Sequence, residues 1–517
     1  MAKVQTKLGI VEGIEKDGLR VFLGIPYAMP PTGERRFRPP EPVKAWTGIK
    51  SAKSYGSTVP QSTSPTSIAW IFEATEPAGD DCLNLNVWTP ASAGTMSRLP
   101  VFFWIHGGGF QMGAGCDPMY AGTAFAHDGI VTITINYRLG IQGNLMVDGV
   151  EGAGNFGMLD QICALQWVRD NIMAFGGDPE NVTIAGESAG GQSVGILLAM
   201  PRAKGLFRRA IVQSGAAHNA ISRSSGLAIT RRIAEEVGVS ADDIEALRKV
   251  PLDKLLAAEK VILNRSLARQ EPSFGELMLA ALPLASLPVF GTPELPELPI
   301  NAIRKGASVD VDLVVGVCEK ESLGTMRLSP EMFGEYGNNL PSSTIEAIAT
   351  LALSKDEALT AIDQYRHNRP EANNIEIFAA LFSDWSFIMP ALRLAEAHAD
   401  YGTTYMFQIS WKSPGGDGKW DASHTLDIPL LFDTCDSDHG RYITGEAAPR
   451  ELIHAVHGAW VSFVRGDSPP AVPFLDKTHL LWPVFNTKQR ETMFFDVPPS
   501  IQLDPRKSER LLWVGKL

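Results

Sequence analysis

The sequence contains few cysteines, and they follow no regular spacing. Five are spread along its 517 residues, at positions 82, 116, 163, 318 and 435. An odd, scattered set of this kind is not the disulfide framework of a small secreted protein. The first thirteen residues, MAKVQTKLGIVEG, also lack the apolar core of a signal peptide. We therefore expect a cytoplasmic protein; a secreted protein whose leader has been removed is the alternative.

Long apolar runs and basic clusters are missing as well. No stretch reaches the ~20 uninterrupted apolar residues that span a membrane, and residues 277–290, which come closest, contain Pro283 and Pro288. The net charge is −12, and no block of lysine or arginine offers the cations on which binding to a nucleic-acid backbone depends. We expect neither a membrane span nor a nucleic-acid partner.

The motifs of metal and dinucleotide enzymes are also absent. Histidines and cysteines show neither H-E-x-x-H nor C-x-x-C spacing, and no G-x-G-x-x-G opens a strand-helix-strand unit. We expect no metal and no cofactor. The composition, 44% hydrophobic and 20% charged, is ordinary for a globular enzyme.

Among the features that the sequence does contain, the central one is a serine between two glycines. Residues 182–185, Val-Thr-Ile-Ala, suit a buried strand, and residues 194–198 can cover one side of a helix. Between them, Gly186-Glu187-Ser188-Ala189-Gly190 fills the G-x-S-x-G pattern of a nucleophile elbow. Glycines are needed because side chains at these positions would obstruct so tight a turn. A chance match in a glycine-rich turn is the alternative; the flanking strand and helix favour the elbow.

Strands alternate with helices along much of the chain. Apolar runs at residues 100–105 and 130–135 are typical of strands covered on both faces, and apolar residues spaced by three and four predict a helix over 158–172. This alternation predicts an α/β fold with a mostly parallel sheet. Other expected strands are an opening hairpin over 8–27 and the segments 209–214, 311–317, 403–409 and 491–496, the last at an edge or end of the sheet.

Two segments depart from the alternation. Residues 219–305 are helical and irregular, and residues 340–400 are helical again. We interpret both as insertions that contribute to the active-site cleft. Because no linker composition marks a boundary, we expect a single domain over residues 1–517.

Short motifs occur in a fixed order over almost the whole chain. They are a proline-rich stretch at residues 22–48, Asp81-Cys82-Leu83-Asn84-Leu85-Asn86, His106-Gly107-Gly108-Gly109-Phe110, Asn136-Tyr137-Arg138, the Ser188 turn, Gln213-Ser214-Gly215 and Trp482-Pro483. Together they resemble the type B carboxylesterases, the cholinesterase-like branch of the α/β-hydrolases. The resemblance implies the α/β-hydrolase fold, a large mixed and mostly parallel sheet flanked by helices, and hydrolysis of carboxylic esters.

A serine hydroxyl is a weak nucleophile, so it needs a base to take its proton and a third group to hold that base. In α/β-hydrolases the chain order is serine, acid, histidine. Glu321 follows the strand expected at 311–317, and His424 follows the one expected at 403–409. Both loops resemble those of the family. We therefore predict a triad of Ser188, Glu321 and His424.

Other residues compete for these roles. Glu319 lies two positions before Glu321 and is expected to be solvated instead. His218 and His439 are the competing histidines, whereas His106 is expected to bind the backbone of its own glycine turn.

Acyl transfer also needs donors directed at the oxygen that becomes negative. The resemblance implies the backbone amides of Gly108, Gly109 and Ala189 as this oxyanion hole; a glycine-rich turn without that role is the alternative. It further implies that Glu187 lies beside the nucleophile and Ser214 near the acid-base pair, neither with a chemical step of its own. Two ion pairs of architectural importance are also implied, Arg36 with Asp80 and Arg138 with Asp160.

The sequence departs from the family at two places. Cys82 matches one half of the family's N-terminal disulfide, but Val59 occupies the partner position. Without this bond the loop over 59–82 should be comparatively mobile. Ser322 replaces the family's glycine directly after Glu321.

The residues aligned with the substrate pocket are small or aliphatic. Leu282 and Leu284 fall at the expected acyl-pocket wall, and Gly324 and Thr325 stand where cholinesterases carry aromatic residues. Such a wall offers no cation-π cage for a quaternary ammonium, although Trp70 could supply an aromatic wall from the other side. We therefore expect neutral ester substrates with medium or bulky acyl groups.

These observations lead to a serine carboxylic-ester hydrolase that forms an acyl-enzyme on a small-molecule ester. The same triad could instead cleave a carbamate or an anilide. A more distant alternative is a non-catalytic, cholinesterase-like binding protein. The sequence leaves the oligomeric state open.

Overall fold

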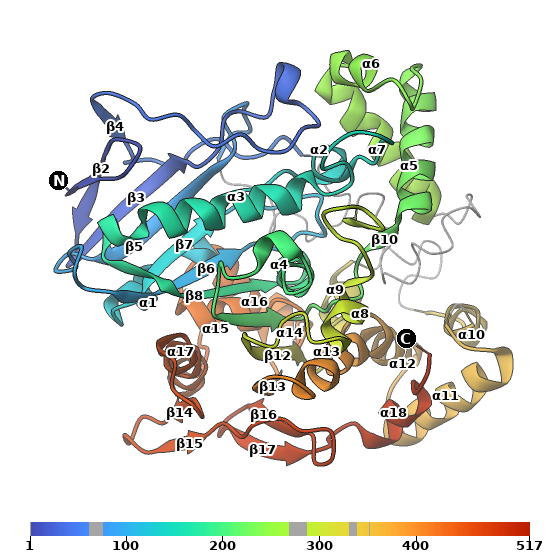
Figure 1. Cartoon of the computed structure of the whole chain (residues 1–517). Helices are drawn as coiled ribbons and strands as arrows, with labels where there is room; N and C mark the ends of the chain where they lie inside the picture. Colours follow the sequence, from blue (N-terminus) through green and yellow to red (C-terminus); the bar gives the residue numbers. More distant parts are fainter. Residues whose placement is uncertain (1, 62–75, 268–286, 330–338, 351, 517) are drawn as a thin grey trace. The chain divides into compact units, whose positions relative to one another are not determined.

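The computed structural model describes the chain in two compact units (Figure 1). The described residues are 2–61, 76–267, 287–329, 339–350 and 352–516. The first unit comprises Met1–Thr63, Phe72–Ile211 and Ala217–Asp312, and the second Ser64–Ile71, Val212–Ala216 and Leu313–Leu517. A single domain over residues 1–517 stays a prediction.

The sheet of the first unit starts antiparallel and becomes parallel toward the serine strand. Its strand order is β1-β2-β3-β5-β7-β6-β8. β2 and β3 form the predicted hairpin around Asp17, and β6 lies parallel to both β7 and β8. The strands are β1 (Ala2–Gln5), β2 (Ile10–Lys16), β3 (Leu19–Pro26), β5 (Asn84–Pro90), β6 (Leu99–Ile105), β7 (Val131–Ile135) and β8 (Gly177–Glu187), and β4 (Ile49–Ser51) pairs with β2.

The apolar runs of the sequence become the buried centre of this sheet. Every residue of β7 is buried, as is β6 from Val101 to its end at Ile105. α3 (Phe156–Asn171) and α4 (Ala189–Leu197) both pack against β8. The strand predictions at 100–105 and 130–135 are therefore confirmed, and the turn containing Ser188 lies between a buried strand and a buried helix.

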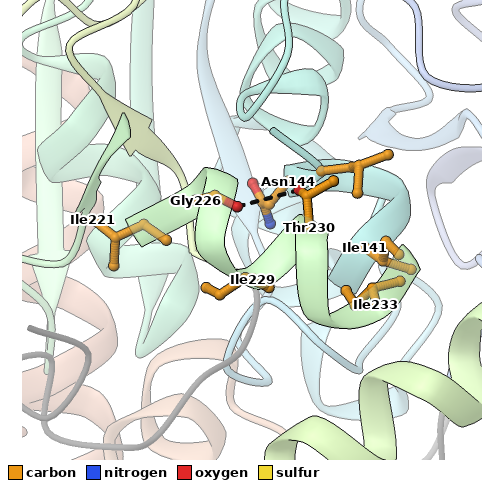
Figure 2. A pocket seen from close by; sticks show the side chains of 8 residues that line it. Ile141, Asn144, Ile221, Gly226, Ile229, Thr230 and Ile233 are labelled. Carbon is orange, nitrogen blue, oxygen red and sulfur yellow. Dashed lines mark hydrogen bonds between the residues drawn. The ribbon is translucent and has the colours of Figure 1, made fainter. Parts of the chain in front are cut away.

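The segment over 219–305 is helical where the structure describes it. It contains α5 (Arg223–Val237), α6 (Ile244–Lys249), α7 (Leu252–Leu267) and α8 (Pro299–Arg304), and two short parallel strands, β10 (Ile221–Ser222) and β11 (Val289–Phe290). Ile229 and Ile233 of α5 line a cavity together with Ile141 of α2 (Gly140–Asn144), and Figure 2 shows Ile233 beside Ile141. The cavity that they help to line holds only about 10 Å³. It is far too small for an ester substrate.

Four further strands of the large sheet lie largely in the second unit, where β14 (Ala471–Pro473) and β15 (His479–Leu481) form a separate antiparallel pair. β12 (Asp312–Cys318), β13 (Thr404–Ile409) and β16 (Glu491–Phe495) run parallel, and β17 (Ser500–Leu503) returns antiparallel to β16. The strand predicted at residues 491–496 is confirmed as β16, but its predicted place at an edge or end of the sheet is wrong, because β17 pairs with its outer side. All four residues of β17, Ser-Ile-Gln-Leu, are exposed, and their alternation of polar and apolar residues is only four residues long, which is too short to predict a strand.

α13 (Met389–Ala399) packs against β13 of this sheet, and α17 (Arg450–Arg465) packs against β16. The other helices of this unit include α9 (Leu323–Leu328), α10 (Ser342–Ala349), α11 (Lys355–Asn368), α12 (Asn374–Ser383), α15 (Asp427–Phe432), α16 (Asp438–Thr444) and α18 (Lys507–Leu512). α12 and α13 are joined by a π-helical turn, Asp384–Ile388. The continuous span Asn374–Ala399 is long and apolar enough to cross a membrane, but 83% of its most apolar window is buried inside the protein. That burial is typical of a core helix.

Aromatic packing explains why β13 is buried. Phe407 of β13 contacts Trp460 of α17 with ring centroids 4.9 Å apart, and Trp482 and Phe495 join the same cluster. Gly316 of β12 leaves the space for it, because a methyl group there would lie 2.0 Å from the Phe407 ring. β9 (Arg209–Gln213) begins in the first unit and ends in the second, where the Ser214 amide donates to the Gly316 carbonyl at 2.8 Å.

Candidate active site

The turn containing Ser188 has the backbone of an elbow. Ser188 has φ 56° and ψ −123°, and such a positive φ is rare for residues that carry a side chain. A methyl group on Gly186 would lie 2.4 Å from the carbonyl carbon of Gly190, and one on Gly190 would lie 2.0 Å from the carbonyl oxygen of Ile105. Both glycines of the G-x-S-x-G pattern are therefore required by packing.

A second glycine turn lies directly against this elbow. A methyl group on Gly107 would lie 2.9 Å from the Glu187 carbonyl oxygen and 3.2 Å from Cβ of Ser188. Gly108 and Gly109 have φ 104° and 63°, which favours glycine at both positions. In the part of the chain that the structure describes, the amides of Gly108, Gly109 and Ala189 donate no hydrogen bond. These three donors remain available to a ligand.

His106 supports the glycine turn. Its buried ring stacks on Tyr137 with centroids 4.5 Å apart, and its Nδ1 is 2.8 Å from the Gly107 carbonyl oxygen. Burial lowers the pKa of His106 to about 4, so the ring is neutral at pH 7 and Nδ1 carries the proton that it donates. The predicted backbone contact of His106 is confirmed.

Glu321 and His424 form a short hydrogen bond. Nδ1 of His424 donates to Oε2 of Glu321 at 2.6 Å, and Glu321 is fully buried. The other carboxylate oxygen accepts from the Ser214 hydroxyl and the Cys318 amide, both at 2.7 Å. The predicted contacts of Glu321 with His424 and of Ser214 with the acid are confirmed.

The competing residues lie elsewhere. The Glu319 amide donates to the Ile409 carbonyl at 2.9 Å, and its own carbonyl accepts from Arg506. His439 belongs to α16, and His218 lies in the first unit between β9 and β10. The histidine that contacts the buried carboxylate is therefore His424.

The acid and histidine loops are tied together. The His424 amide donates to the Glu321 carbonyl at 3.0 Å, and the Ser423 hydroxyl donates to the Lys320 carbonyl at 2.9 Å. The ring of Phe387 packs against the imidazole with centroids 4.8 Å apart. Backbone and side-chain contacts thus fix both partners of the short hydrogen bond.

A buried carboxyl group that we did not predict lies three residues after the histidine. Asp427 Oδ2 accepts from Gln213 Nε2 at 2.5 Å, and Gln213 Oε1 accepts from the Trp460 indole at 3.1 Å. Burial raises the pKa of Asp427 to about 6, and the negative charge of Glu321 adds to the rise. An acidic residue within the apolar run at 426–432 was the available signal.

The two predicted ion pairs have different outcomes. Arg138 and Asp160 form a buried bidentate pair, with N–O distances of 2.6 and 2.7 Å. Arg36 instead donates to the carbonyl oxygens of Arg248 and Val250, while Asp80 is exposed. No Arg36–Asp80 ion pair occurs in the described structure, because α6 and its following turn supply neutral acceptors. That prediction is wrong.

Only part of the predicted pocket can be located. Gly324 is buried in α9, where its amide donates to the Ser423 hydroxyl at 2.7 Å, and Thr325 follows it. A methyl group on Gly324 would lie 2.7 Å from the Trp420 carbonyl oxygen. Trp70, Leu282 and Leu284, like residues 62–75 of the loop predicted to be mobile, lie outside the described residues.

Three further observations bear on chemistry. All five cysteines have free thiols, including Cys82, whose disulfide partner position holds Val59. Among the described residues, no three acidic, histidine or cysteine side chains are grouped so as to hold a metal ion. Glu187, predicted to lie beside the nucleophile, is buried at the end of β8, with Oε2 2.9 Å from where a Gly107 methyl group would be.

Comparison with known proteins gives one consistent result. A profile described as the carboxylesterase family matches residues 1–513. The chain is 33% identical over 515 residues to the para-nitrobenzyl esterase of Bacillus subtilis (strain 168), covering 98% of this chain and 97% of that esterase. It is 34% identical over 491 residues to a phenmedipham hydrolase of Pseudarthrobacter oxydans, covering 93% and 92%. A crystal structure of a Geobacillus stearothermophilus carboxylesterase matches with a TM-score of 0.83 at 33% identity, covering 99% of both chains. The predicted α/β-hydrolase fold is thereby confirmed.

Proposed function

Because the chain belongs to the carboxylesterase family and is a carboxylic ester hydrolase, we propose that it works through an acyl-enzyme formed on Ser188. The observation that carries this proposal is the 2.6 Å hydrogen bond between buried Glu321 and His424. A carboxylate in this position fixes the ring so that Nδ1 holds a proton and Nε2 is the basic nitrogen.

The reaction has two halves. Nε2 of His424 takes the Ser188 proton as Oγ attacks the ester carbonyl carbon, and the same proton then passes to the departing alcohol. In the second half a water molecule gives its proton to Nε2 and attacks the acyl carbon, and Ser188 recovers its proton as the carboxylic acid leaves. Glu321 stabilises the imidazolium that exists in each half and is not itself protonated.

The oxygen that becomes negative needs preorganised donors. The amides of Gly108, Gly109 and Ala189 support this role, since none has a partner within the described residues and Gly107 joins their turn to the elbow. Ala189 also opens α4, whose N-terminal end carries a partial positive charge.

We infer a preference for neutral esters with medium or bulky acyl groups. Gly324 and Thr325, which stand after the acid where cholinesterases carry aromatic residues, contribute no ring to a cation-π cage for a quaternary ammonium. Purified protein should therefore hydrolyse neutral esters of graded acyl size faster than it hydrolyses acetylcholine. A kcat/KM for acetylcholine above all neutral esters would contradict this preference.

Chemical labelling of Ser188 tests the central proposal. A fluorophosphonate should react stoichiometrically with the wild-type protein, and peptide mapping should find the label on Ser188. Ser188→Ala should abolish both labelling and ester hydrolysis while leaving the thermal unfolding midpoint nearly unchanged, because the side chain contributes little packing. Label on a different serine, or hydrolysis retained by Ser188→Ala, would refute it.

The same triad could act on a carbamate or an anilide. Rates on an ester and an anilide with the same acyl group, and on a carbamate with the same alcohol as the ester, would rank the three reactions. A folded protein that hydrolyses none of them and takes no label would favour the non-catalytic alternative.

A further inference from the structure

The guanidinium group of Arg506 connects the C-terminal segment with the loop that carries Glu321. Arg506 lies between β17 and α18, with its side chain only 13% exposed. Nη2 donates to the Glu319 carbonyl at 2.5 Å, and Nη1 donates to Asp384 Oδ1 at 3.0 Å. One side chain near the end of the sequence thus holds two elements that precede it by more than a hundred residues.

Both elements lie next to the acid-base pair. Glu319 is two residues before Glu321, whose Oε1 accepts from the Cys318 amide. Asp384 opens the π-helical turn Asp384–Ile388. Immediately before that turn, the Ser383 hydroxyl accepts from the Ser322 amide at 3.0 Å, and Ser322 directly follows Glu321.

The π-helical turn also contacts the histidine. Its fourth residue is Phe387, whose ring packs against the His424 imidazole. π-Helical turns are uncommon and often occur at functional sites, because the extra residue redirects side chains. A displacement of this turn would therefore move the Ser322 contact and the Phe387 contact together.

The far side of Asp384 is also held by hydrogen bonds. Its Oδ2 accepts from the Tyr365 hydroxyl, which in turn accepts from the Trp513 indole at 3.0 Å. Asp384 is fully buried, and a buried carboxylate is stable only when it is paired. Arg506 supplies the cation of that pair, so the π-helical turn depends on it directly.

We propose that Arg506 is a positioning residue for the acid-base pair. It fixes the loop of Glu321 through the Glu319 carbonyl, and it fixes the turn that packs on His424 through Asp384. This inference rests on the proposed function, since positioning matters only if Glu321 and His424 carry out the proton transfers.

Loss of Arg506 has a specific kinetic signature. When the acid loop loosens, Glu321 stabilises the His424 imidazolium less well, so proton transfer slows. We expect Arg506→Ala to lower kcat by about a hundredfold, the scale of a small misplacement of catalytic groups. KM should change by less than about twofold, and the acid limb of the kcat/KM profile should move to lower pH.

Arg510→Ala is the matched control. Arg510 belongs to α18 and pairs with Asp504, at 2.6 and 2.9 Å, without contacting the acid loop. It should leave kcat and the pH profile unchanged even if it lowers the melting temperature. Arg506→Lys keeps the charge but not the planar fork that spans two acceptors. We expect it to fold and to lose about tenfold in kcat with the same direction of pH shift.

Three outcomes would overturn the inference. The first is a folded Arg506→Ala variant with the kcat and pH profile of the wild type. The second, which applies if Arg506→Ala does not fold, is an Arg506→Lys variant with the kcat and pH profile of the wild type. The third is a loss of kcat in Arg510→Ala equal to the loss in Arg506→Ala. Ser188→Ala, measured in parallel, separates the two levels. If Ser188→Ala keeps its activity, the proposed function itself is refuted. If Ser188→Ala is inactive and the Arg506 variants have wild-type activity, only the role of Arg506 is refuted.

Discussion

The two units hold their predicted catalytic residues in different ways. In the first unit the Ser188 elbow and the turn at 107–109 are shaped by backbone contacts that only glycine permits. In the second unit Glu321 and His424 are held by hydrogen bonds from side chains and amides that come from separate stretches of chain. We expect one substitution in the glycine-dependent backbone to disrupt the whole turn. Where several hydrogen bonds hold a residue, we expect each substitution to remove only part of the activity.

The largest effect on the free energy of unfolding is expected where the backbone of the Ser188 elbow packs against the backbone of Ile105. Gly190→Ala would bring a methyl group to 2.0 Å from the Ile105 carbonyl oxygen, so we expect a loss of about 3 kcal/mol or more in the free energy of unfolding. Gly94→Ala, at a position with no atom within 4 Å of the added methyl group, is the control and should be nearly neutral. Denaturant unfolding of both variants checks this, and equal midpoints would contradict it.

The next effect, on kcat, distinguishes the predicted acid Glu321 from its neighbour Glu319. Glu321→Gln keeps the shape but removes the charge, and kcat should fall by about 10⁴-fold, the scale for an amide in place of a triad carboxylate. Glu319→Gln should stay within about twofold of wild type, because its bonds to Ile409 and Arg506 use the backbone. Steady-state kinetics on one ester would decide, and similar losses in both variants would leave the acid unassigned.

Asp427 extends the comparison to pH. Its pKa is raised to about 6, so the folded state binds the proton more tightly than the unfolded state does, and stability falls as the pH rises from about 4 to 6. Asp427→Asn removes that loss. Relative to wild type, its free energy of unfolding should therefore improve by about 3 kcal/mol between pH 4 and pH 8. Asp436→Asn, at an exposed position, should show no such change, and a pH-independent difference at Asp427 would contradict the prediction.

The smallest effect concerns one hydrogen bond of Glu321. Ser214→Ala removes the hydroxyl donor to Oε1 but leaves the Cys318 amide, so kcat should fall by about tenfold, the equivalent of ~1.5 kcal/mol for a bond to a charged group. Ser193→Ala is the control, since that buried hydroxyl accepts from Gln161 in the first unit. A loss as large as that of Glu321→Gln would mean that the acid depends on a single donor.

The same contrast explains what could be predicted from the sequence. The strands β6 and β7, the elbow and the glycine turn depend on local patterns, and each was predicted close to its observed bounds. Glu321 and His424 required the family resemblance, because nothing local marks them. Asp427 and Arg506 were missed, since their importance lies in partners more than a hundred residues away. The wrongly expected Arg36–Asp80 pair failed for the same reason: the carbonyls that receive Arg36 belong to a remote helix and the turn after it.

The close approach of Gly190 to the Ile105 carbonyl has a practical meaning for enzyme engineering. The codons of Gly107, Gly108, Gly186 and Gly190 offer almost no useful diversity to a mutant library, because an added methyl group would lie 2.0 to 2.9 Å from a main-chain atom. Diversity is better spent on the neighbours of Glu321 and His424, where single hydrogen bonds can be exchanged one at a time. Phe387 and Asp427 are suitable first positions, since each touches or influences the histidine loop through a side chain alone.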